Sequence, residues 1–386
     1  MRIATLNVWG LPAPFTPHGA RRMRAIGRRL PTLDLDVISF QEVWTSDARR
    51  ILLRAGRAAG LTNAWHTDTA FGGSGLLVLS RLPMLEVQFE PFELQGQPER
   101  ITEGEYYGGK GFARVRLDTP LGPVTLINTH LHARYGRQAM REYTSLRTAQ
   151  VVELAIRTRQ TTDAIIATGD FNFQEGQAGY GVLTGLTGLR DTAAEVEQRQ
   201  PTVYSGNPYR FGKRKQDKRI DFVFVRDGDE VGLTTQRVER VFDEVFEVDG
   251  QRAGYSNHAG VLSEIDLAQR ETPLVHLADH RAVELATNLL SEGRTEAARR
   301  QRSDRALATT GLGGAVLALA ALRAKPMTRR ALLRRSLKAA GLVAIAPALG
   351  YSMLSEYFVP HELAGFDAVA QRLSEFDWLD DKSSIA

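Results

Sequence analysis

The chain has 386 residues, of which 43% are hydrophobic and 24% are charged. This composition excludes wholesale disorder, and the length allows two or three domains. The absence of cysteine excludes disulfides and thiolate metal sites, so a metal ion would have oxygen or nitrogen ligands, typical of magnesium, calcium or manganese before zinc. The net charge of +4 favours an anionic partner, either nucleic acid or a membrane surface.

The N-terminal residues 2–8 alternate as a strand and place Asn7 at its end, before a proline-rich turn. Since no long apolar core follows a basic start, we expect no cleavable signal peptide. Asn7 would bind a metal or a phosphate, or would simply cap the following loop. The apolar residues 11–15 beside it would be covered by protein or would dip into lipid.

The next segments predict a helix, a strand and a second helix. Residues 21–30 have helical spacing with a basic outer face, residues 36–40 read as a buried strand, and residues 45–60 read as a helix. Glu42 directly follows the buried strand, as Asn7 follows the first. Open sheets place ligands beyond the ends of their strands, so these two side chains indicate a candidate site.

A glycine-rich turn and strand at residues 72–81 are followed by Lys110, which stands between glycines before another strand. We expect Lys110 to be exposed, where it would contact a phosphate or would simply be solvated. Residues 124–128 predict a buried strand that leads to His130 and His132. The two histidines alternate along the chain and share a face, which allows a metal-binding pair or a hydrogen-bonded histidine beside the site.

The strand at residues 165–173 carries the strongest polar signal. It follows an amphipathic helix at residues 144–160, and it presents Asp170 and Asn172 on one side of the backbone. A carboxylate beside an amide suits holding a water or a phosphoryl oxygen, although the same residues are common in turns. The order strand, helix, strand favours a layered α/β or α+β domain.

Two later segments add further candidates. A basic run between residues 213 and 219, a solvated loop or an anion-binding segment, precedes a strand at residues 220–225 that begins with Asp221. A carboxylate is unusual at the start of a buried strand unless it has a partner. His258 precedes an apolar stretch, where a histidine can act as a general base near neutral pH.

Eight short motifs stand in order over residues 1–266, namely LNVWG, QEVW, SGLLVLSR, GGKGF, NTHLHA, GDFN, RIDFVFV and SNH. Together they resemble the endonuclease/exonuclease/phosphatase superfamily and look, more narrowly, like the neutral sphingomyelinases. The narrower resemblance rests on the segment NTHLHARYGRQ, the Lys110 turn and the helix RMRAIGRRL. The resemblance implies a catalytic domain over residues 1–267 with a four-layer α/β sandwich of two packed sheets flanked by helices. It implies a magnesium- or manganese-dependent phosphodiesterase of phospholipase C type that converts sphingomyelin or a related sphingophospholipid into ceramide and a phosphorylated headgroup.

The preferred partner is therefore a phospholipid membrane with an anionic surface, and not nucleic acid. Two alternatives remain open. A metal-dependent nuclease or phosphatase of the same superfamily would use the same kind of site. The second alternative is a catalytically weakened homologue that binds lipid, which Asn257 suggests because the family has aspartate at this position.

The resemblance also assigns roles to residues. Glu42 would ligate the metal with help from Asn7, and His258 would be the base. Asp170 and Asn172 would orient the water and the phosphate, and His130 would contact a phosphoryl oxygen. Asp221 would fix a neighbouring histidine. Lys110 and Glu105 would form a switch, although the family would have aspartate at the position of Glu105. The family also reads Ser-Asp-His where this chain reads Ser256, Asn257, His258. We expect the amide of Asn257 to orient His258 without stabilising its charge, which would lower activity.

The C-terminal third lies beyond the resemblance. We expect a basic helical linker at 268–305, membrane-associated apolar helices at 306–359 and an acidic tail at 360–386. Within the apolar part, the runs 306–322 and 339–355 are at the short end for spanning helices. The charge pattern favours a first run that lies in the interface or on protein and a second that spans, with the catalytic domain cytoplasmic. A two-span hairpin and a soluble helical bundle are the alternatives.

Overall fold

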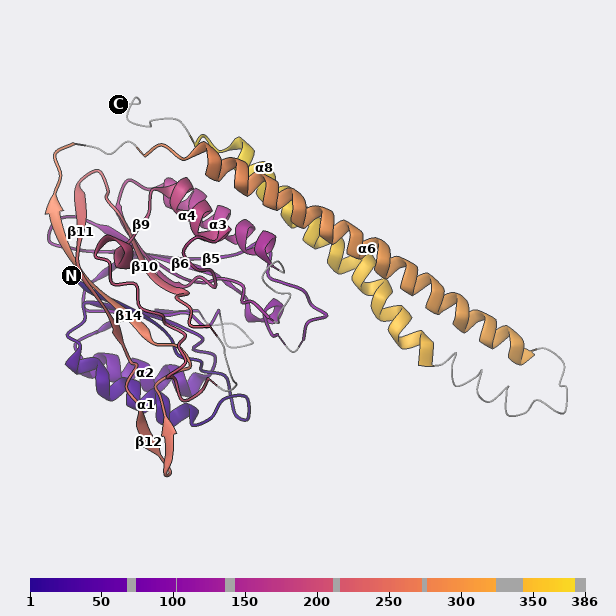
Figure 1. Cartoon of the computed structure of the whole chain (residues 1–386), viewed down its shortest axis with the longest axis horizontal. Coiled ribbons are helices and arrows are strands. Elements are labelled where there is room, and N and C mark those ends of the chain that lie inside the picture. Colours follow the sequence, from indigo (N-terminus) through magenta and orange to yellow (C-terminus); the bar gives the residue numbers. More distant parts are fainter. Residues whose placement is uncertain are drawn as a thin grey trace. The chain divides into compact units, whose positions relative to one another are not determined.

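The structure is a computed structural model, and it describes residues 1–67, 74–101, 103–135, 143–210, 216–272, 276–323 and 343–378 (Figure 1). The chain forms two compact units. The first consists of Met1–Ala286 together with Leu373–Ala386, and the second is Thr287–Arg372. Each unit is described by itself below.

The first unit is built on two six-stranded sheets. One sheet has the order β11 (Val231–Val241), β14 (Gly260–Gln269), β1 (Arg2–Asn7), β2 (Val37–Gln41), β4 (Leu77–Ser80) and β3 (Asn63–His66). The other has the order β5 (Met84–Pro91), β6 (Gly111–Leu117), β7 (Val124–His130), β8 (Ala164–Asp170), β10 (Asp221–Arg226) and β9 (Arg190–Asp191). The β1–β2 and β7–β8 pairs are parallel and the others are antiparallel, so both sheets are mixed.

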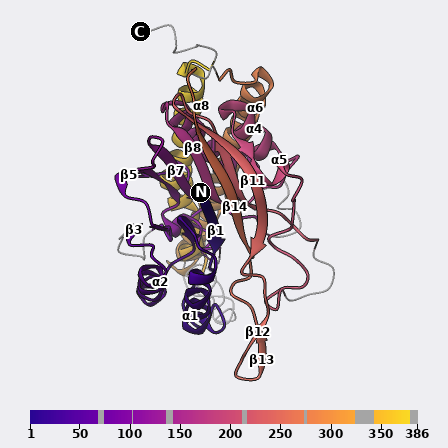
Figure 2. The ribbon, with the colours of Figure 1, turned by 90° about the vertical axis from the view of Figure 1, so that its left-hand side faces the viewer.

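Helices cover the outer faces of the two sheets. Figures 1 and 2 show α1 (Gly19–Arg29) and α2 (Ser46–Ala58) on the first sheet, and α3 (Thr144–Arg159) and α4 (Ala178–Thr187) on the second. Short elements complete the unit: η1 (Leu30–Thr32), η2 (Tyr106–Gly108), α5 (Thr192–Glu195) and the hairpin β12 (Phe246–Val248) with β13 (Gln251–Ala253). The predicted four-layer α/β sandwich is confirmed.

The strand β1 shows why these sequences form inner layers. Ile3 faces the other sheet, where it joins an apolar cluster with Ile166, while Leu6 faces the helices and packs in a cluster with Ile26 of α1. A strand that is buried on both faces needs apolar residues at both alternating positions. This accounts for the continuous apolar runs by which the strands were predicted.

Polar side chains join the two sheets toward one end of the sandwich. The Thr168 hydroxyl donates to Ser39 Oγ at 2.8 Å, and Gln41 Nε2 donates to Asn128 Oδ1 at 2.7 Å. Each of these buried groups therefore has a partner across the sheet interface. The sheets are fixed relative to each other where β2 and β8 deliver their terminal residues.

The second unit is formed by the distal part of α6 (His280–Arg323), a π-helical turn η3 (Leu354–Phe358) and α8 (Val359–Glu375). Ion pairs join the two arms, with Arg294 Nε 2.5 Å from Asp367 Oδ1 and Arg305 Nε 2.7 Å from Glu356 Oε1. Beyond Arg305 the arms pack through small residues, since a Cβ on Gly311 would lie 2.8 Å from that of Ala348. Large apolar side chains are exposed there, including Leu317 and Val343.

Within the described part of the chain, no helix carries an apolar stretch long enough to cross a membrane. The transmembrane helix expected from the sequence is therefore not supported by those residues. The second apolar run begins among residues 324–342, which lie outside the described residues together with the basic residues 213–215.

Candidate active site

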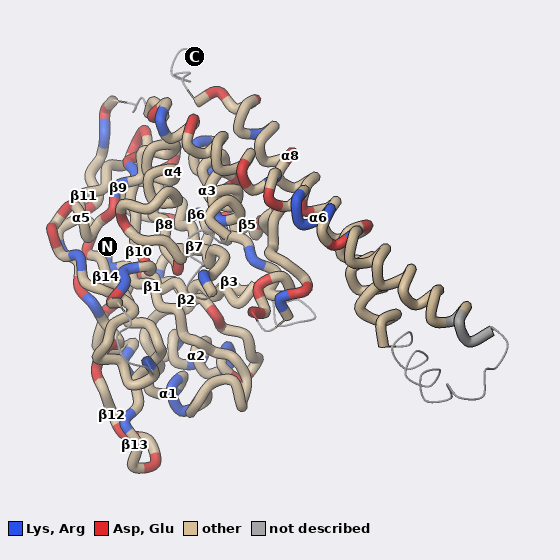
Figure 3. The backbone as a smooth tube through the Cα atoms, turned by 45° about the vertical axis from the view of Figure 1, so that its right-hand side comes forward, with Lys and Arg blue, Asp and Glu red and all other residues tan. Residues whose placement is uncertain are grey.

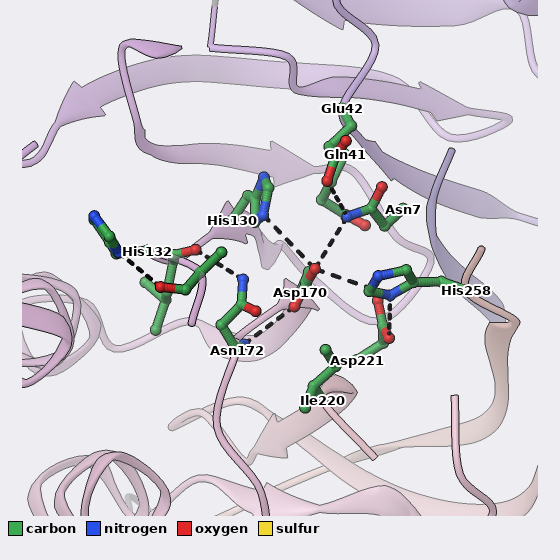
Figure 4. A network of polar contacts seen from close by, with 12 residues as sticks. Asn7, Gln41, Glu42, His130, His132, Asp170, Asn172, Ile220, Asp221 and His258 are labelled. Atoms are coloured by element: carbon green, nitrogen blue, oxygen red, sulfur yellow. Dashed lines mark hydrogen bonds and ion pairs between the residues drawn. The ribbon is translucent and has the colours of Figure 1, made fainter. Parts of the chain in front are cut away.

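Asp170 is the centre of a polar network at the ends of β1, β2, β7, β8 and β10 (Figure 4). Asn7 Nδ2 donates to Asp170 Oδ2 at 3.0 Å and to Glu42 Oε1 at 2.8 Å. Asp170 Oδ1 accepts the backbone N–H of Asn172 at 3.1 Å. His130 approaches from β7, with Nε2 3.6 Å from Asp170 Oδ2. These side chains come from four strand ends that are far apart in the sequence.

Two of these residues have an unusual backbone. Glu42 has φ 60° and Asn172 has φ 52°, both in the left-handed region. Asparagine tolerates this region better than most residues, whereas glutamate does not. The Glu42 carbonyl accepts the Gly10 N–H at 3.0 Å, and a Cβ on Gly10 would lie 2.4 Å from that oxygen. Glycine at position 10 thus permits the contact that holds Glu42 in place.

A similar constraint applies to the glycine that precedes Asp170. Gly169 has φ 149°, and a Cβ there would lie 2.0 Å from the Thr129 carbonyl oxygen of β7. Only glycine allows β7 and β8 to approach this closely where both strands end. The approach places His130 opposite Asp170 in the parallel register.

His258 and Asp221 form a histidine–carboxylate pair. His258 Nδ1 lies 2.9 Å from Asp221 Oδ2 and 3.9 Å from Asp170 Oδ2. Both residues are buried. The proton on Nδ1 therefore faces the carboxylates, and no hydrogen bond to another described residue engages Nε2. Such a tautomer leaves Nε2 to accept a proton.

The pKa values of the buried groups are strongly perturbed. Burial opposes the charged form of His258, but the carboxylates of Asp221 and Asp170 outweigh it and raise its pKa to about 9. Burial, followed by the charge of Asp221, raises the pKa of Asp170. Burial and the charge of Lys110 lower the pKa of His130 well below its usual value, so His130 is neutral.

The donor set fits a divalent cation. Ligand atoms of Glu42, His130 and Asp170 lie within 4.8 Å of one another, as do those of Asp170, Asp221 and His258. Asp221 Oδ1 and His130 Nδ1 are buried and have no hydrogen-bond partner among the residues that the structure describes. Concentrated negative charge on hard oxygen atoms suits magnesium or manganese.

Asn7 has a different orientation from the one expected of a metal ligand. Its amide nitrogen bridges the carboxylates of Glu42 and Asp170, while its oxygen accepts the Trp9 N–H at 2.9 Å. The amide orientation follows from this network, since only N–H can donate to both carboxylates. Asn7 thus holds the two acidic groups at their spacing.

Asn257 does not orient His258, contrary to expectation. The Asn257 Oδ1 accepts from the Ser256 hydroxyl at 3.3 Å, while Asp221 takes the ring proton of His258. The charge that was thought to be missing is supplied by Asp221.

Lys110 is buried and not exposed as expected. Its Nζ pairs with Glu105 Oε2 at 2.8 Å and donates to the Leu131 carbonyl at 2.8 Å. The same carbonyl accepts the Asn172 side chain at 3.0 Å. Burial opposes ionisation of Glu105, but Lys110 and the nearby histidines outweigh it and lower its pKa to about 2. The pair therefore acts on Asn172 through a shared carbonyl.

The metal-binding pair considered for His130 and His132 does not form. His132 Nδ1 lies 2.8 Å from the Ala133 carbonyl, and its ring packs against Tyr143 at a centroid distance of 4.1 Å. Burial lowers the pKa of His132 to about 4. Figure 4 shows His132 on the far side of the network from Asp170. The strand β7 ends at His130, so the strand alternation on which the expectation depended stops before His132.

The sequence did not reveal Arg22. This residue belongs to the helix whose arginines were expected on its outer face, but it is fully buried. It donates to the carbonyls of Val8 at 2.8 Å, Trp9 at 2.7 Å, Pro17 at 3.0 Å and Tyr255 at 3.0 Å. Burial lowers its pKa to about 10. Arg22 thereby fixes the segment after β1 to the segment that carries His258.

The chain is similar in sequence to known proteins. The model of the Endonuclease/Exonuclease/phosphatase family matches residues 4–240. A candidate neutral sphingomyelinase of Drosophila melanogaster is 31% identical over 278 residues, which are 70% of this chain and 62% of that protein. An inositol phosphosphingolipids phospholipase C of Schizosaccharomyces pombe is 29% identical over 225 residues, or 56% of this chain and 51% of that protein. The chain thus spans between about half and two thirds of these relatives.

Solved structures share the fold. TDP2 of D. rerio, complexed with a single-strand DNA product, superposes with a TM-score of 0.55 at 18% identity, over 69% of this chain and 98% of that one. A double mutant of beta toxin from Staphylococcus aureus with bound magnesium ions superposes with a TM-score of 0.51 at 15% sequence identity, over 68% of this chain and 98% of that one. Likeness at these identities shows the fold alone. With its family model matched over well more than half of its length, the chain belongs to the endonuclease/exonuclease/phosphatase family.

Proposed function

We propose that this chain is a magnesium-dependent phosphodiesterase of phospholipase C type that acts on phosphosphingolipids. The observation that carries the proposal is the convergence of a histidine–carboxylate pair, His258 with Asp221, on the acidic cluster of Glu42 and Asp170. The lipid substrate class is supported by the relatives, which are named for sphingolipid hydrolysis. The products would be ceramide and a phosphorylated headgroup.

The proposed metal ligands are Glu42 and Asp170, with His130 beside them. When bound there, magnesium or manganese would neutralise charge on a phosphate oxygen and would offset the carboxylates that keep the His258 pKa high. Asn7 keeps Glu42 and Asp170 at their spacing by donating to both. Its role is to position the ligands.

The remaining residues act on the water and the phosphate. His258 Nε2 takes a proton from the attacking water while Asp221 stabilises the imidazolium, a general-base step that typically contributes ~10²- to 10⁴-fold. Asp170 and Asn172 orient the water and the phosphate, and neutral His130 hydrogen-bonds a phosphoryl oxygen. Lys110 and Glu105 support Asn172 through the Leu131 carbonyl.

We further propose that the partner surface is a phospholipid membrane carrying anionic lipid. The net charge of +4 favours such a surface. The loop after β1 exposes Leu11 and Phe15, four and eight residues after the strand that ends in the site. Exposed apolar side chains in the second unit, with Leu317 and Val343 among them, offer a second apolar surface.

One assay tests the proposed function. The purified full chain, with magnesium, is offered phosphosphingolipid vesicles, plasmid DNA and an inositol phosphate in parallel. We expect ceramide release from the vesicles, no cleavage of the other two substrates, and no ceramide release by Glu42→Ala. Cleavage of DNA or of the inositol phosphate in preference to lipid would overturn the lipid assignment. Lipid binding without turnover would favour the weakened homologue.

A further inference from the structure

We infer that Arg134 selects the headgroup of the lipid, favouring an uncharged polyol such as inositol over the cationic choline of sphingomyelin. This inference rests on the proposed function and assigns a substrate class to the same site. Arg134 stands two residues after His132, in the loop between β7 and α3. It is half-buried and lies next to Asn172, which contacts Asp170 directly.

Hydrogen bonds hold the Arg134 guanidinium at this place. Nε donates to the backbone carbonyl of Asn172 at 3.1 Å, and Nη2 donates to the side chain of Gln177. Gln177 is the N-cap residue of α4, so Arg134 is held at the positive end of that helix. The third nitrogen, Nη1, has no hydrogen-bond acceptor in the part of the chain that the structure describes.

Charge distinguishes Arg134 from the other cations of the site. Lys110 is neutralised by Glu105 at 2.8 Å, whereas no carboxylate among the described residues pairs with Arg134. Burial lowers the pKa of Arg134. Arg147 adds a second positive charge nearby and itself donates to backbone carbonyls, to that of His132 at 3.0 Å. The side of the site next to Asn172 is therefore electropositive.

The chemistry of the headgroup decides what such a position accepts. A guanidinium N–H donates to hydroxyl oxygens of a polyol, and its charge favours a substrate with net negative charge. Choline offers no acceptor and carries a positive charge, so the two guanidinium groups would repel it. Arg134 contacts Asn172 and not Asp170, so it lies beside the acidic cluster and not within it. The proposal places the headgroup on this side of the scissile phosphate.

The test compares kcat/KM for an inositol phosphosphingolipid and for sphingomyelin at equal mole fraction in neutral detergent micelles with magnesium. We expect the wild type to prefer the inositol lipid. We expect Arg134→Gln to lower kcat/KM for that lipid by roughly 10- to 100-fold, as for loss of a hydrogen bond to a charged group, and to leave sphingomyelin unchanged or faster. Arg134→Lys keeps the charge, so its kcat/KM for the inositol lipid should lie between those of the wild type and of Arg134→Gln. Arg50→Gln removes an exposed arginine paired with Asp47 and should change neither substrate.

The outcomes separate this inference from the proposed function. If both lipids are hydrolysed but Arg134→Gln lowers both equally, Arg134 only supports the Asn172 loop and the headgroup inference is wrong. The headgroup inference is also wrong if Arg134→Gln leaves the ratio of the two kcat/KM values unchanged, or if the wild type prefers sphingomyelin. If the wild type cleaves neither lipid, the proposed function fails and this inference fails with it. Should Arg134→Gln not fold, Arg134→Lys decides the matter through the same ratio.

Discussion

Asp221 Oδ2 lies 2.9 Å from His258 Nδ1, although Asp221 begins β10 and His258 stands two residues before β14 in the opposite sheet. Asp221 also stands directly across from Asp170 in the antiparallel register of β10 and β8. Two carboxylates on neighbouring strands thus face one imidazole. The pair fixes the tautomer of His258 and supplies the charge that its protonated form needs.

Replacing Asp221 by Asn should therefore disable the base. An amide keeps the shape but removes the charge and permits the wrong tautomer, so we expect kcat/KM to fall by about 10²- to 10⁴-fold. The pKa of His258 should also fall from about 9, because burial then acts with one opposing carboxylate fewer. NMR titration of His258 in metal-free protein measures this, and an unchanged pKa would contradict the pairing.

Asn257→Asp should leave turnover near neutral pH within about threefold of the wild type, in the range of surface substitutions without special contacts. The sequence predicted a gain, because aspartate would have replaced a missing charge. In the structure the Asn257 amide contacts Ser256 and Asp221 already holds the ring. Steady-state kinetics of the wild type and of Asn257→Asp measures the difference. A large gain in turnover from Asn257→Asp would show that the charge is missing after all, as the sequence predicted.

The sequence predicted those site residues that stand at strand ends. Apolar runs delimit β1, β2, β8 and β10, and each run ends or begins at a polar residue, namely Asn7, Glu42, Asp170 or Asp221. Strand ends on one side of packed sheets meet, so local patterns were enough to place these side chains together. The two sheets and their covering helices followed from the same runs.

Partners that depend on packing could not be predicted in this way. Arg22 lies on a helix rich in arginine, and nothing local shows which of them turns inward. Lys110 looked like a turn lysine because its partners, Glu105 and the Leu131 carbonyl, approach only in the folded chain. The end of β7 at His130 likewise could not be read from the local pattern, and the backbone N–H of His132 donates to the Gln150 side chain on α3 and not to a neighbouring strand.

Glu42→Gln should abolish lipid hydrolysis and weaken magnesium binding. The amide keeps the size of the side chain but removes a charged oxygen ligand. We expect EDTA to inactivate the wild type reversibly, and magnesium to raise its melting temperature by binding the native state. That shift should be lost in Glu42→Gln but kept in Glu247→Gln, an exposed change on β12. An equal magnesium shift in both variants would place the metal elsewhere.

The metal-free protein should lose stability as the pH rises. Asp170 has its folded pKa raised to about 7 from an ordinary value near 4, and His258 has its pKa raised to about 9 from 6.5. Both groups bind protons more tightly when folded, so their contribution is complete below the unfolded values and is lost as the pH passes the folded ones. We expect a falling melting temperature between about pH 5 and pH 9 in EDTA.

Asp170→Asn provides the control for this pH dependence, because the amide cannot ionise. Its melting temperature should fall less steeply between about pH 5 and pH 8 than that of the wild type, while catalysis is lost. Added magnesium should stabilise the wild type most at high pH, where the carboxylates are charged. A pH profile identical in wild type and variant would show that Asp170 does not titrate in this range.

Arg22→Met should destabilise the first unit and impair catalysis together. The change keeps an unbranched side chain but leaves four buried carbonyl contacts without their donor, which we expect to cost on the order of 3 kcal/mol of unfolding free energy. Arg21→Met is the matched control, since Arg21 pairs with Asp249 on the surface, where an ion pair contributes little to stability. Denaturant unfolding measures both. Arg22 joins the segment after β1 to the segment before His258, so the kcat of folded Arg22→Met should fall as well. If Arg22→Met were as stable as Arg21→Met, the buried guanidinium would be dispensable.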